Sequence, residues 1–339
     1  MGKCSVAVVI LNYNGVEHLQ RFLPGVVRHT DAEVIVADNG STDGSVEWLT
    51  AALPQLRVIR MDKNYGFAEG YNVALRQVEA DIYVLLNSDV ETPAGWLQPL
   101  LEYMEAHQEC VACQPKILSY RDKSLFEYAG AAGGYIDSFG YPFCRGRLLS
   151  MVEKDDGQYD SVAEVFWATG ACLMIRSSAY WGAGGLDGRF FAHQEEIDLC
   201  WRLRARGGSV VCVPQSAVYH VGAGTLSYES PKKTYLNFRN NALLLYKNEA
   251  RRYGWVCTVR LFLDWTAALH MVLQGKPRNA TQVFKAQMDF FKMKGQFRHD
   301  REENLRLTSV ENPVGVLNHL LLISVYLKGI KRYSGLGWK

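Results

Sequence analysis

Three carboxylates lie within four positions of one short stretch of the chain. The stretch reads FFAHQEEIDLCWRLRARG, covers residues 190–207, and contains Glu195, Glu196 and Asp198. A carboxylate within hydrogen-bond reach of a hydroxyl can take its proton, and a neighbouring carboxylate raises its pKa and makes it a better base. A solvated, charged helix face would have the same spacing. The other motifs of the chain decide between these two interpretations.

The arginines that follow the acidic group suggest a second role for part of it. If the stretch is helical, Asp198 and Arg202 lie one turn apart and can form an ion pair that supports the helix. An Arg202 that faces a diphosphate is the alternative. We therefore expect base chemistry from the two glutamates and a structural role for Asp198.

A second chemical group follows an apolar run in LLNSDVE. Alternation along a strand would point Asn87 and Asp89 to the same side, where Asp89 offers an oxygen to Mg²⁺ or Mn²⁺. A cation there would bridge diphosphate oxygens, whereas an Asx turn is the alternative. His220, in AVYHVGAGT, is a suitable further ligand for manganese, although a single histidine is also commonly structural.

The elements that position these groups alternate between apolar runs and helical spacing. Strands are predicted at 6–13 and 81–89 and at the starts of EVIVADNGSTDGS and LRVIRMDKNYGFAEGYNVALRQV, with helices between them, which favours an α/β fold with a parallel, doubly wound sheet. Ligands bind at the carboxyl ends of such strands. Those ends carry Asn12, Tyr13, Asp38, Asn64 and the segment 87–89. The GxGxxG and GxxxxGK[ST] phosphate loops are absent from the sequence.

The remainder of the chain changes character twice. Strand-like pieces at 111–118, 164–176 and 208–221 alternate with glycine-rich turns, and 128–146 is predicted to be a mobile loop. Helical spacing returns from about 231. Cys110 and Cys113 form a CxxC among apolar neighbours without a second ligand pair, so packing is expected rather than zinc or redox chemistry.

Charge divides the chain into an acidic front and a basic back. Residues 1–227 hold 18 Lys and Arg against 27 Asp and Glu, and residues 228–339 hold 19 against 8. We therefore predict a catalytic domain over 1–227 and a basic, mainly helical region over 228–339. Nucleic acid is a poor partner for this region because no aromatic-basic module is present.

Two apolar stretches in the basic region, 256–273 and 314–330, are shorter than the roughly 20 residues that cross a bilayer. They are predicted to be helices that lie on an anionic membrane surface, and the alternatives are packing on the catalytic domain or a homodimer interface. The eight cysteines form no regular framework, and the start of the chain is not typical of a signal peptide. A cytoplasmic protein, peripheral on the inner face of the membrane, is expected.

Five segments together resemble the inverting glycosyltransferases of family 2, which have the GT-A fold, a Rossmann-like and mostly parallel sheet flanked by helices. The resemblance covers about residues 5–225 and is nearest to the rhamnosyl- and galactofuranosyl-type transferases of bacterial surface polysaccharide synthesis. The segments that carry it are VVILNYNG, VIVADNGSTDGS, NYGFAEGYNVAL, YVLLNSDVETPAGWL and ATGACLMIRSSAYWGAGGLDGRFFAHQEEIDLCWRLRARG, followed by YHVGAGT.

The resemblance implies a role for each candidate residue. Where the family has the metal motif Asp-x-Asp, this chain has Asn87-Ser88-Asp89, so Asp89 matches the usual ligand and Asn87 contacts the metal, the sugar or the ribose. His220 matches a late metal-binding histidine. Glu196 falls on the position of the catalytic base, with Glu195 as its support. The nucleotide pocket would be lined by Asn12, Tyr13, Asp38 and Asn64.

The implied activity is a transfer that depends on Mn²⁺ or Mg²⁺, from a nucleotide-diphospho-sugar to a glycan or lipid-linked acceptor. Trp167 is either a platform for a sugar ring or part of the core. A sugar-nucleotide nucleotidyltransferase would need a Gly/Arg/Lys-rich signature that LNYNGVEHL lacks. A non-catalytic membrane scaffold of the same fold would be supported by loss of Asp89 and Glu196, and both are present.

Overall fold

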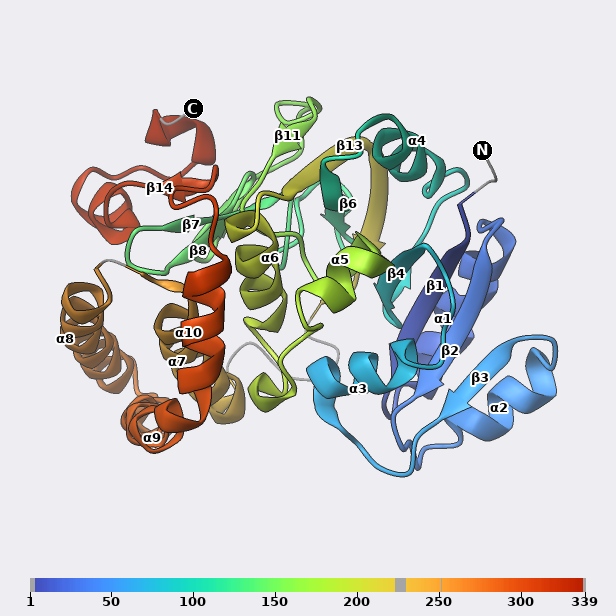
Figure 1. Ribbon diagram of the computed structural model, residues 1–339, viewed down its shortest axis with the longest axis horizontal. Coiled ribbons are helices and arrows are strands. Elements are labelled where there is room, and N and C mark those ends of the chain that lie inside the picture. Colours follow the sequence, from blue (N-terminus) through green and yellow to red (C-terminus); the bar gives the residue numbers. More distant parts are fainter. Residues whose placement is uncertain (1–3, 223–229, 251, 338–339) are drawn as a thin grey trace.

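A nine-stranded mixed sheet carries most of the residues singled out above (Figure 1). The computed structural model describes residues 4–222, 230–250 and 252–337. The strands run in the order β11-β13-β6-β12-β4-β1-β2-β3, and β5 pairs with β13. Their bounds are β1 (Val6–Asn12), β2 (Glu33–Asp38), β3 (Arg57–Arg60), β4 (Ile82–Asn87), β5 (Val90–Glu91), β6 (Cys110–Ser119), β11 (Ala163–Glu164), β12 (Cys172–Arg176) and β13 (Ser209–His220).

The four strands β4-β1-β2-β3 are parallel, as the alternating pattern predicted. The valines and isoleucines of β1 and β2 are buried on both faces, which is typical of parallel strands covered by helices. Beyond β4 the sheet is mixed, because β12 runs antiparallel to both β4 and β6. The parallel unit places the carboxyl ends of β1, β2 and β4 at one edge.

Helices cover both faces of this sheet and form a separate group at one end of the molecule (Figure 1). The first group is α1 (Val16–Arg28), α2 (Ser45–Ala52), α3 (Gly66–Leu75), α4 (Gln98–Ala106), α5 (Ser177–Gly182) and α6 (Glu195–Ala205), with the short helix η1 (Gly188–Phe190). The end group is α7 (Pro231–Asn248), α8 (Tyr253–Leu273), α9 (Pro277–Met293) and α10 (Arg298–Leu307), with η2 (Lys294–Phe297), η3 (Ile323–Leu327) and η4 (Tyr333–Leu336).

The prediction of a mobile loop over 128–146 is wrong, because this segment provides two strands of a second sheet. The order is β10-β9-β8-β7-β14, with β7 (Gly134–Asp137), β8 (Pro142–Cys144), β9 (Arg147–Leu148), β10 (Met151–Val152) and β14 (Val316–Leu317). The glycines that suggested mobility make room for packing. A Cβ on Gly134 would lie 2.1 Å from the ring of Trp167. Trp167 is buried and donates from Nε1 to the carbonyl of Tyr135 at 2.8 Å, so it belongs to the core.

The two apolar stretches of the basic region also differ from expectation, the first in the length of its helix and the second in its secondary structure. The first lies within α8, whose 21 residues make it the one helix in the described ranges that is long and apolar enough to cross a membrane. The prediction of a helix over 314–330 is wrong. Val316 and Leu317 pair with β7 instead, the amide of Leu321 donates to Asp137, and only the single turn η3 follows. This long-range pairing leaves no local trace in the sequence.

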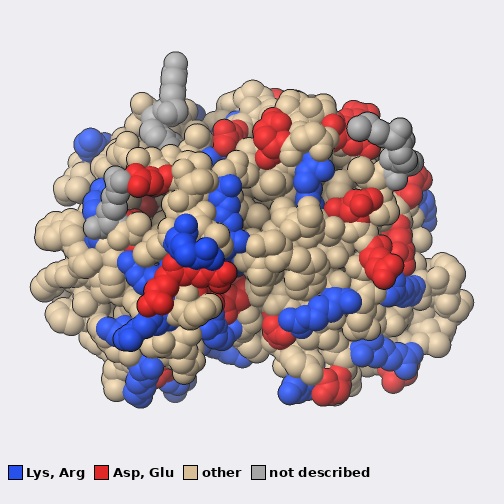
Figure 2. Space-filling model, viewed as in Figure 1, with Lys and Arg blue, Asp and Glu red and all other residues tan. Residues whose placement is uncertain are grey.

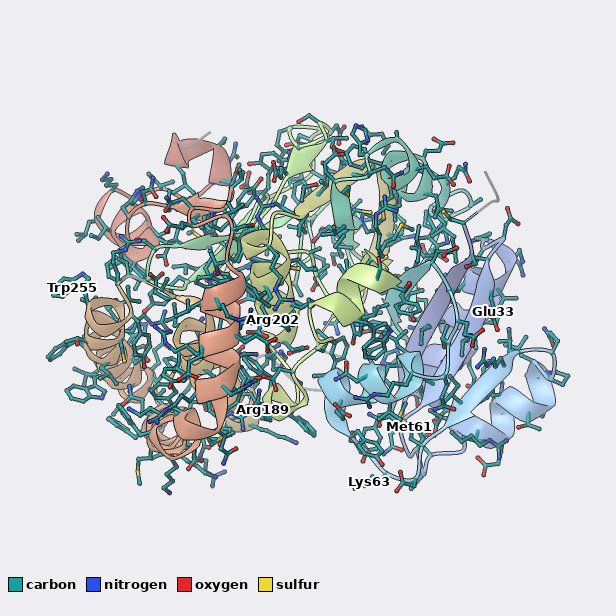
Figure 3. All side chains as sticks on the ribbon, in the orientation of Figure 1. Glu33, Met61, Lys63, Arg189, Arg202 and Trp255 are labelled. Atoms are coloured by element: carbon teal, nitrogen blue, oxygen red, sulfur yellow. The ribbon has the colours of Figure 1, made fainter. Side chains whose placement is uncertain are left out.

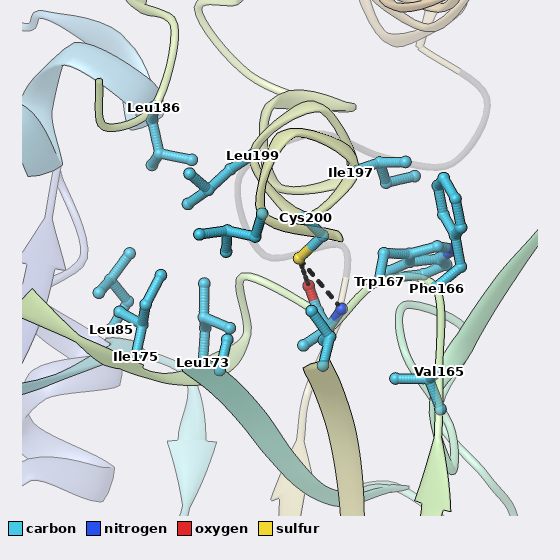
Figure 4. Close-up of a cluster of buried hydrophobic side chains, with 14 of the residues drawn as sticks. Leu85, Val165, Phe166, Trp167, Leu173, Ile175, Leu186, Ile197, Leu199 and Cys200 are labelled. Carbon is cyan, nitrogen blue, oxygen red and sulfur yellow. Dashed lines mark hydrogen bonds between the residues drawn. The ribbon is translucent and has the colours of Figure 1, made fainter. Parts of the chain in front are cut away.

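Helix α6, which begins with the two glutamates, is packed firmly on the sheet (Figure 4). Its Ile197, Leu199 and Cys200 join a buried cluster with side chains of β4 and β12, and the backbone N–H of Ala168 lies 3.5 Å from the sulfur of Cys200. Cys110 and Cys113 are likewise buried within β6, as expected for packing residues.

A buried group of charges ties α6 to α7 across the protein. Lys247 of α7 places Nζ 2.8 Å from Asp198 and 2.7 Å from Asp187. Arg202 also binds Asp198, at 2.8 Å, and donates to the backbone carbonyls of Ala183 and Gly185. Burial raises the pKa of Asp198, but Lys247 and Arg202 outweigh it and hold that pKa below its ordinary value. The predicted ion pair between Asp198 and Arg202 is present and buried, and Figure 3 marks the position of Arg202.

We predict that Lys247→Met lowers the free energy of unfolding by about 3 kcal/mol, because Asp187 and Asp198 would lose a buried cation. Urea unfolding followed by circular dichroism measures the change. The control is Lys292→Met, whose exposed ammonium lies 3.7 Å from Asp289, and it should cost less than about 0.5 kcal/mol. Equal stability of the two variants would contradict the role of this charge group.

Candidate functional site

The first part of the site lies where β4 ends and β13 returns to it. In the pairing of β13 with β5, His220 lies opposite Val90, the residue that directly follows Asp89. This pairing brings the imidazole of His220 close to the carboxylate of Asp89. His220 Nε2 lies 3.1 Å from Asp89 Oδ1 and 3.3 Å from the side-chain nitrogen Nδ2 of Asn87. The structure thus brings together the three residues predicted to hold a cation, although His220 lies more than 130 positions after Asn87 and Asp89 in the chain.

A residue that the sequence did not reveal completes this corner. Glu127 is buried, and its Oε2 lies 3.4 Å from His220 Nδ1, on the far side of the ring from Asp89. Burial lowers the pKa of His220, but Asp89 and Glu127 outweigh this effect and raise it to about 10. Glu127 therefore orients the imidazole. No motif in the sequence marks Glu127, because only the strand pairing places it beside β13.

The side chains of this corner are suited to bind a divalent cation together with a bound diphosphate. A carboxylate and an imidazole nitrogen lie within 3.1 Å of each other, which is a pair of donors that suits Mn²⁺, and the side chain of Asn87 lies beside the imidazole. No group of three or more His, Cys, Asp and Glu side chains in the described ranges is arranged to hold a metal by itself. The oxygens of a bound diphosphate would have to complete the coordination.

The second part of the site is formed by the loops after β1 and β2. Asn12 is fully buried and donates from Nδ2 to Asp38 at 3.1 Å and to Ser41 at 3.2 Å. Asp38 also accepts from the amide of Ser41. Tyr13 is exposed beside this pair. Asn12 and Ser41 therefore set the orientation of Asp38, and Tyr13 presents a ring toward solvent at the same strand end.

The loop before α3 joins the second part. Asn64 Oδ1 accepts from the amide of Gly66 at 2.8 Å and from Asn39 at 3.2 Å, so it caps the helix start and links β2 to it. Asn39 in turn accepts from the amide of Tyr65. Sequence analysis assigned a role to Asn64 but missed Asn39, whose position in a Gly/Ser/Asp loop was its only signal.

The third part is the loop that leads into α6. Phe191, His193 and Gln194 all have positive φ, a conformation that residues other than glycine rarely adopt and that clusters at functional sites. Their turn places Glu195 and Glu196 in the first turn of α6. One carboxylate oxygen of each is buried without a hydrogen-bond partner among the described residues. Such oxygens are available to an acceptor hydroxyl.

The two glutamates have different proton affinities. Burial raises the pKa of Glu196 to about 7, against the lowering effect of backbone N–H groups at the start of α6. Burial, and then the neighbouring Glu196, raises the pKa of Glu195 well above its ordinary value. Two neighbouring carboxylates with raised pKa values are typical of sites that transfer protons, which makes this pair a candidate for such a site.

Two sets of contacts hold this loop in place. The carbonyl of Phe191 accepts from the amides of Phe67 and Ala68 at the start of α3, so the third part lies directly against the second. A Cβ on Gly66 would lie 2.5 Å from the Phe191 ring, and only glycine permits this approach. From the other side, Asn240 of α7 donates to the carbonyls of Phe190, Ala192 and His193 at 2.7–2.9 Å.

The contribution of α7 was missed because the sequence placed it outside the catalytic domain. The predicted boundary at 227–228 lies outside the described residues. On its far side Arg239 donates to the carbonyls of Arg189 and Phe190, and Asn241 to that of Gly140. The division into two domains stays a prediction, but the loop before α6 is held by residues from both sides of the predicted boundary.

Comparison with known proteins identifies relatives of this arrangement. A family model described as "Glycosyl transferase family 2" matches residues 7–181. The N-acetylglucosaminyl-diphospho-decaprenol L-rhamnosyltransferase of Mycobacterium tuberculosis is 27% identical over 288 residues, which is 79% of this chain and 89% of that protein.

Two solved structures share the fold at 16% identity. GalNAc-T7 with UDP, GalNAc and Mn²⁺ gives a TM-score of 0.57, over 87% of this chain and 56% of that one. Residues 1–349 of S. aureus TarS in complex with UDP-GlcNAc give 0.56, over 89% of each chain. The expected GT-A fold with additional C-terminal helices is therefore confirmed.

We predict that Asn240→Ala lowers kcat at least tenfold and leaves the affinity for the donor nucleotide within about twofold, because the loop before Glu196 loses its hydrogen bonds. Steady-state kinetics and nucleotide titration measure the two effects. Asn237→Ala, one turn earlier on α7, is the matched control. A donor affinity that falls together with kcat would instead indicate a general structural defect.

Proposed function

We propose that this chain, which belongs to glycosyl transferase family 2, moves a sugar from a nucleotide-diphospho-sugar to a hydroxyl group of a lipid-linked glycan. It is a glycosyltransferase, so the open questions are the residues, the cation and the acceptor. One observation carries the proposal for the residues. Glu196, with a pKa of about 7 and an unpartnered buried oxygen, stands at the end of a loop that packs on the predicted nucleotide pocket.

The donor nucleotide is assigned to the loops after β1 and β2 and before α3. Asp38 would accept hydrogen bonds from the ribose or base, held in position by Asn12, and Tyr13 would stack on the base. Asn64 would act through the loop that it caps. This assignment is supported by the network of hydrogen bonds from Asn12 through Asp38 and Ser41, which leaves the strand ends rigid.

The diphosphate is assigned to the corner formed by β4 and β13. Asp89 and His220 would hold the divalent cation together with the diphosphate, and Asn87 would contact the cation or the sugar. A cation held there neutralises charge that develops on the nucleoside diphosphate as it leaves. Manganese is favoured over magnesium by the imidazole ligand, and GalNAc-T7, which shares the fold, was solved with Mn²⁺.

The transfer itself needs one proton acceptor. Glu196 would take the proton of the acceptor hydroxyl as its oxygen bonds to the anomeric carbon, while the bond from that carbon to the diphosphate oxygen breaks. Glu195 would form a hydrogen bond with the acceptor and orient it. A single displacement of this kind inverts the anomeric configuration. General-base assistance of this type contributes roughly 10²- to 10⁴-fold to the rate.

The acceptor and the compartment follow from the relatives and the cysteines. The mycobacterial relative is named for an acceptor that is a diphospho-decaprenol, a lipid-linked sugar, and we propose an acceptor of the same chemical class here. All eight cysteines are free thiols, which supports a reducing, cytoplasmic location. The product would then belong to the synthesis of a cell-surface polysaccharide.

Thermal unfolding with UDP, TDP, GDP and CMP, each with and without Mn²⁺, tests the donor site. A nucleotide at 100 times its Kd stabilises the folded state by about 2.7 kcal/mol, so the midpoint should rise with at least one nucleoside diphosphate, and more with Mn²⁺. Asp89→Asn should lose the increment that depends on Mn²⁺, whereas Asp156→Asn, at an exposed carboxylate, should keep it. Absence of any shift in the folded wild type would refute the donor assignment.

A further inference from the structure

In helix α8 the distribution of polar and apolar side chains is the opposite of that in an ordinary surface helix. Its buried side contains an ion pair, whereas its exposed side is mostly apolar, with Thr258, Thr266 and His270 as the exposed polar residues. The buried line is Val256, Arg260, Asp264 and Ala268. The most exposed apolar side chains are Trp255 (65%), Phe262 (60%), Leu269 (62%) and Leu273 (77%), and Trp265 and Val272 complete the stripe.

The charges of α8 are fixed toward the protein. Arg260 and Asp264 approach each other to 3.2 Å, and the guanidinium lies 3.8 Å from the centre of the Tyr141 ring in the second sheet. A crossing of the bilayer would expose this pair to hydrocarbon, which is strongly unfavourable. Although α8 is long enough to span a membrane, its packing favours a position along a surface.

Helix α9 extends the apolar surface. Phe284, Met288 and Phe291 are exposed at helical spacing, and Trp265 of α8 donates to Gln287 of α9 at 2.9 Å. We call the exposed apolar side chains of these two helices the α8–α9 face. Figure 3 shows Trp255 directed outward at the end of the molecule, and Figure 2 shows the corresponding rim as largely uncharged. A soluble monomer rarely exposes so continuous an apolar surface.

Basic side chains accompany this face. Arg252 precedes α8, Arg278 lies at the start of α9, and Lys285 and Lys292 are interleaved with the exposed apolar residues of α9. The acidic residues of the two helices are Asp264, which is buried, and Asp289, which binds Tyr235. Aromatic and aliphatic side chains surrounded by lysine and arginine complement an interface rich in anionic headgroups, and the long basic side chains can extend to it.

We propose that the α8–α9 face lies on the surface of an anionic lipid bilayer, with the exposed side of α8 in the headgroup region. The remainder of the molecule would lie outside the membrane, with the α8–α9 face toward the lipid. Helix α7 packs against both α8 and α9 and also holds the loop before Glu195. If the proposed function holds, a sugar attached to a membrane lipid would reach the base from the docked end.

Flotation of the full chain with vesicles tests the proposal. One set contains phosphatidylcholine alone, and the other contains equal parts of phosphatidylcholine and phosphatidylglycerol. We expect at least tenfold tighter binding to the anionic vesicles, weakened by salt. The double variant Phe262→Ser, Leu269→Ser should bind at least tenfold more weakly, whereas Val162→Ser, at an exposed apolar residue far from the face, should bind like the wild type.

The fold of each variant is checked by its unfolding midpoint, which does not depend on donor or acceptor chemistry. A failed donor test together with vesicle binding would leave the membrane proposal intact. Two outcomes would overturn it. One is equal or no binding of the wild type to the two kinds of vesicle. The other is a wild-type dimer in solution that the double variant converts to monomer, since the face would then bind a second copy of the chain.

Discussion

The contact between α6 and α7 is the constraint on which the rest of the structure depends. Asp187 and Asp198 are buried, and burial of a carboxylate is tolerated only with a cation beside it. Lys247 and Arg202 supply that charge, so the helix that begins with Glu195 and Glu196 cannot shift without separating buried charges. Asn240 adds the hydrogen bonds that the strained loop before α6 needs. Glu196, the proposed base, is therefore held by residues of a region that composition alone had set apart.

This fixed geometry explains how ordinary carboxylates become suited to different tasks. Glu196 is buried enough for its pKa to reach about 7, and burial and the neighbouring Glu196 also raise the pKa of Glu195. At the strand ends, burial raises the pKa of Asp89, but the neighbouring His220 outweighs it and holds that pKa below its ordinary value. In the proposed mechanism one carboxylate binds charge and another transfers a proton, and the packing of Phe191 on α3 links the loop before α6 to the predicted nucleotide pocket.

The sequence predicted the parts of this structure that leave a local pattern. The strands β1 to β4 and helices α1 to α3 follow from apolar runs and helical spacing, and the residues Asn87, Asp89 and His220 were found as separate motifs that the sheet brings together. The second sheet, Glu127 and Asn240 were missed because each depends on pairing between distant segments. Trp167 and Gly134 illustrate the reason. Gly134 was interpreted as part of a loop, but the absence of a side chain there allows the indole of Trp167 to pack against the backbone.

Single-turnover transfer, measured as a function of pH for the wild type and for Glu196→Gln, tests the central claim most directly. With donor bound, the wild-type rate should rise tenfold per pH unit below about 7 and level off above it, because the base must be deprotonated. Glu196→Gln should bind the donor normally but transfer at least about 10²-fold more slowly, with no such dependence on pH. A variant that transfers at the wild-type rate, or that keeps the same pH profile, would show that Glu196 is not the base.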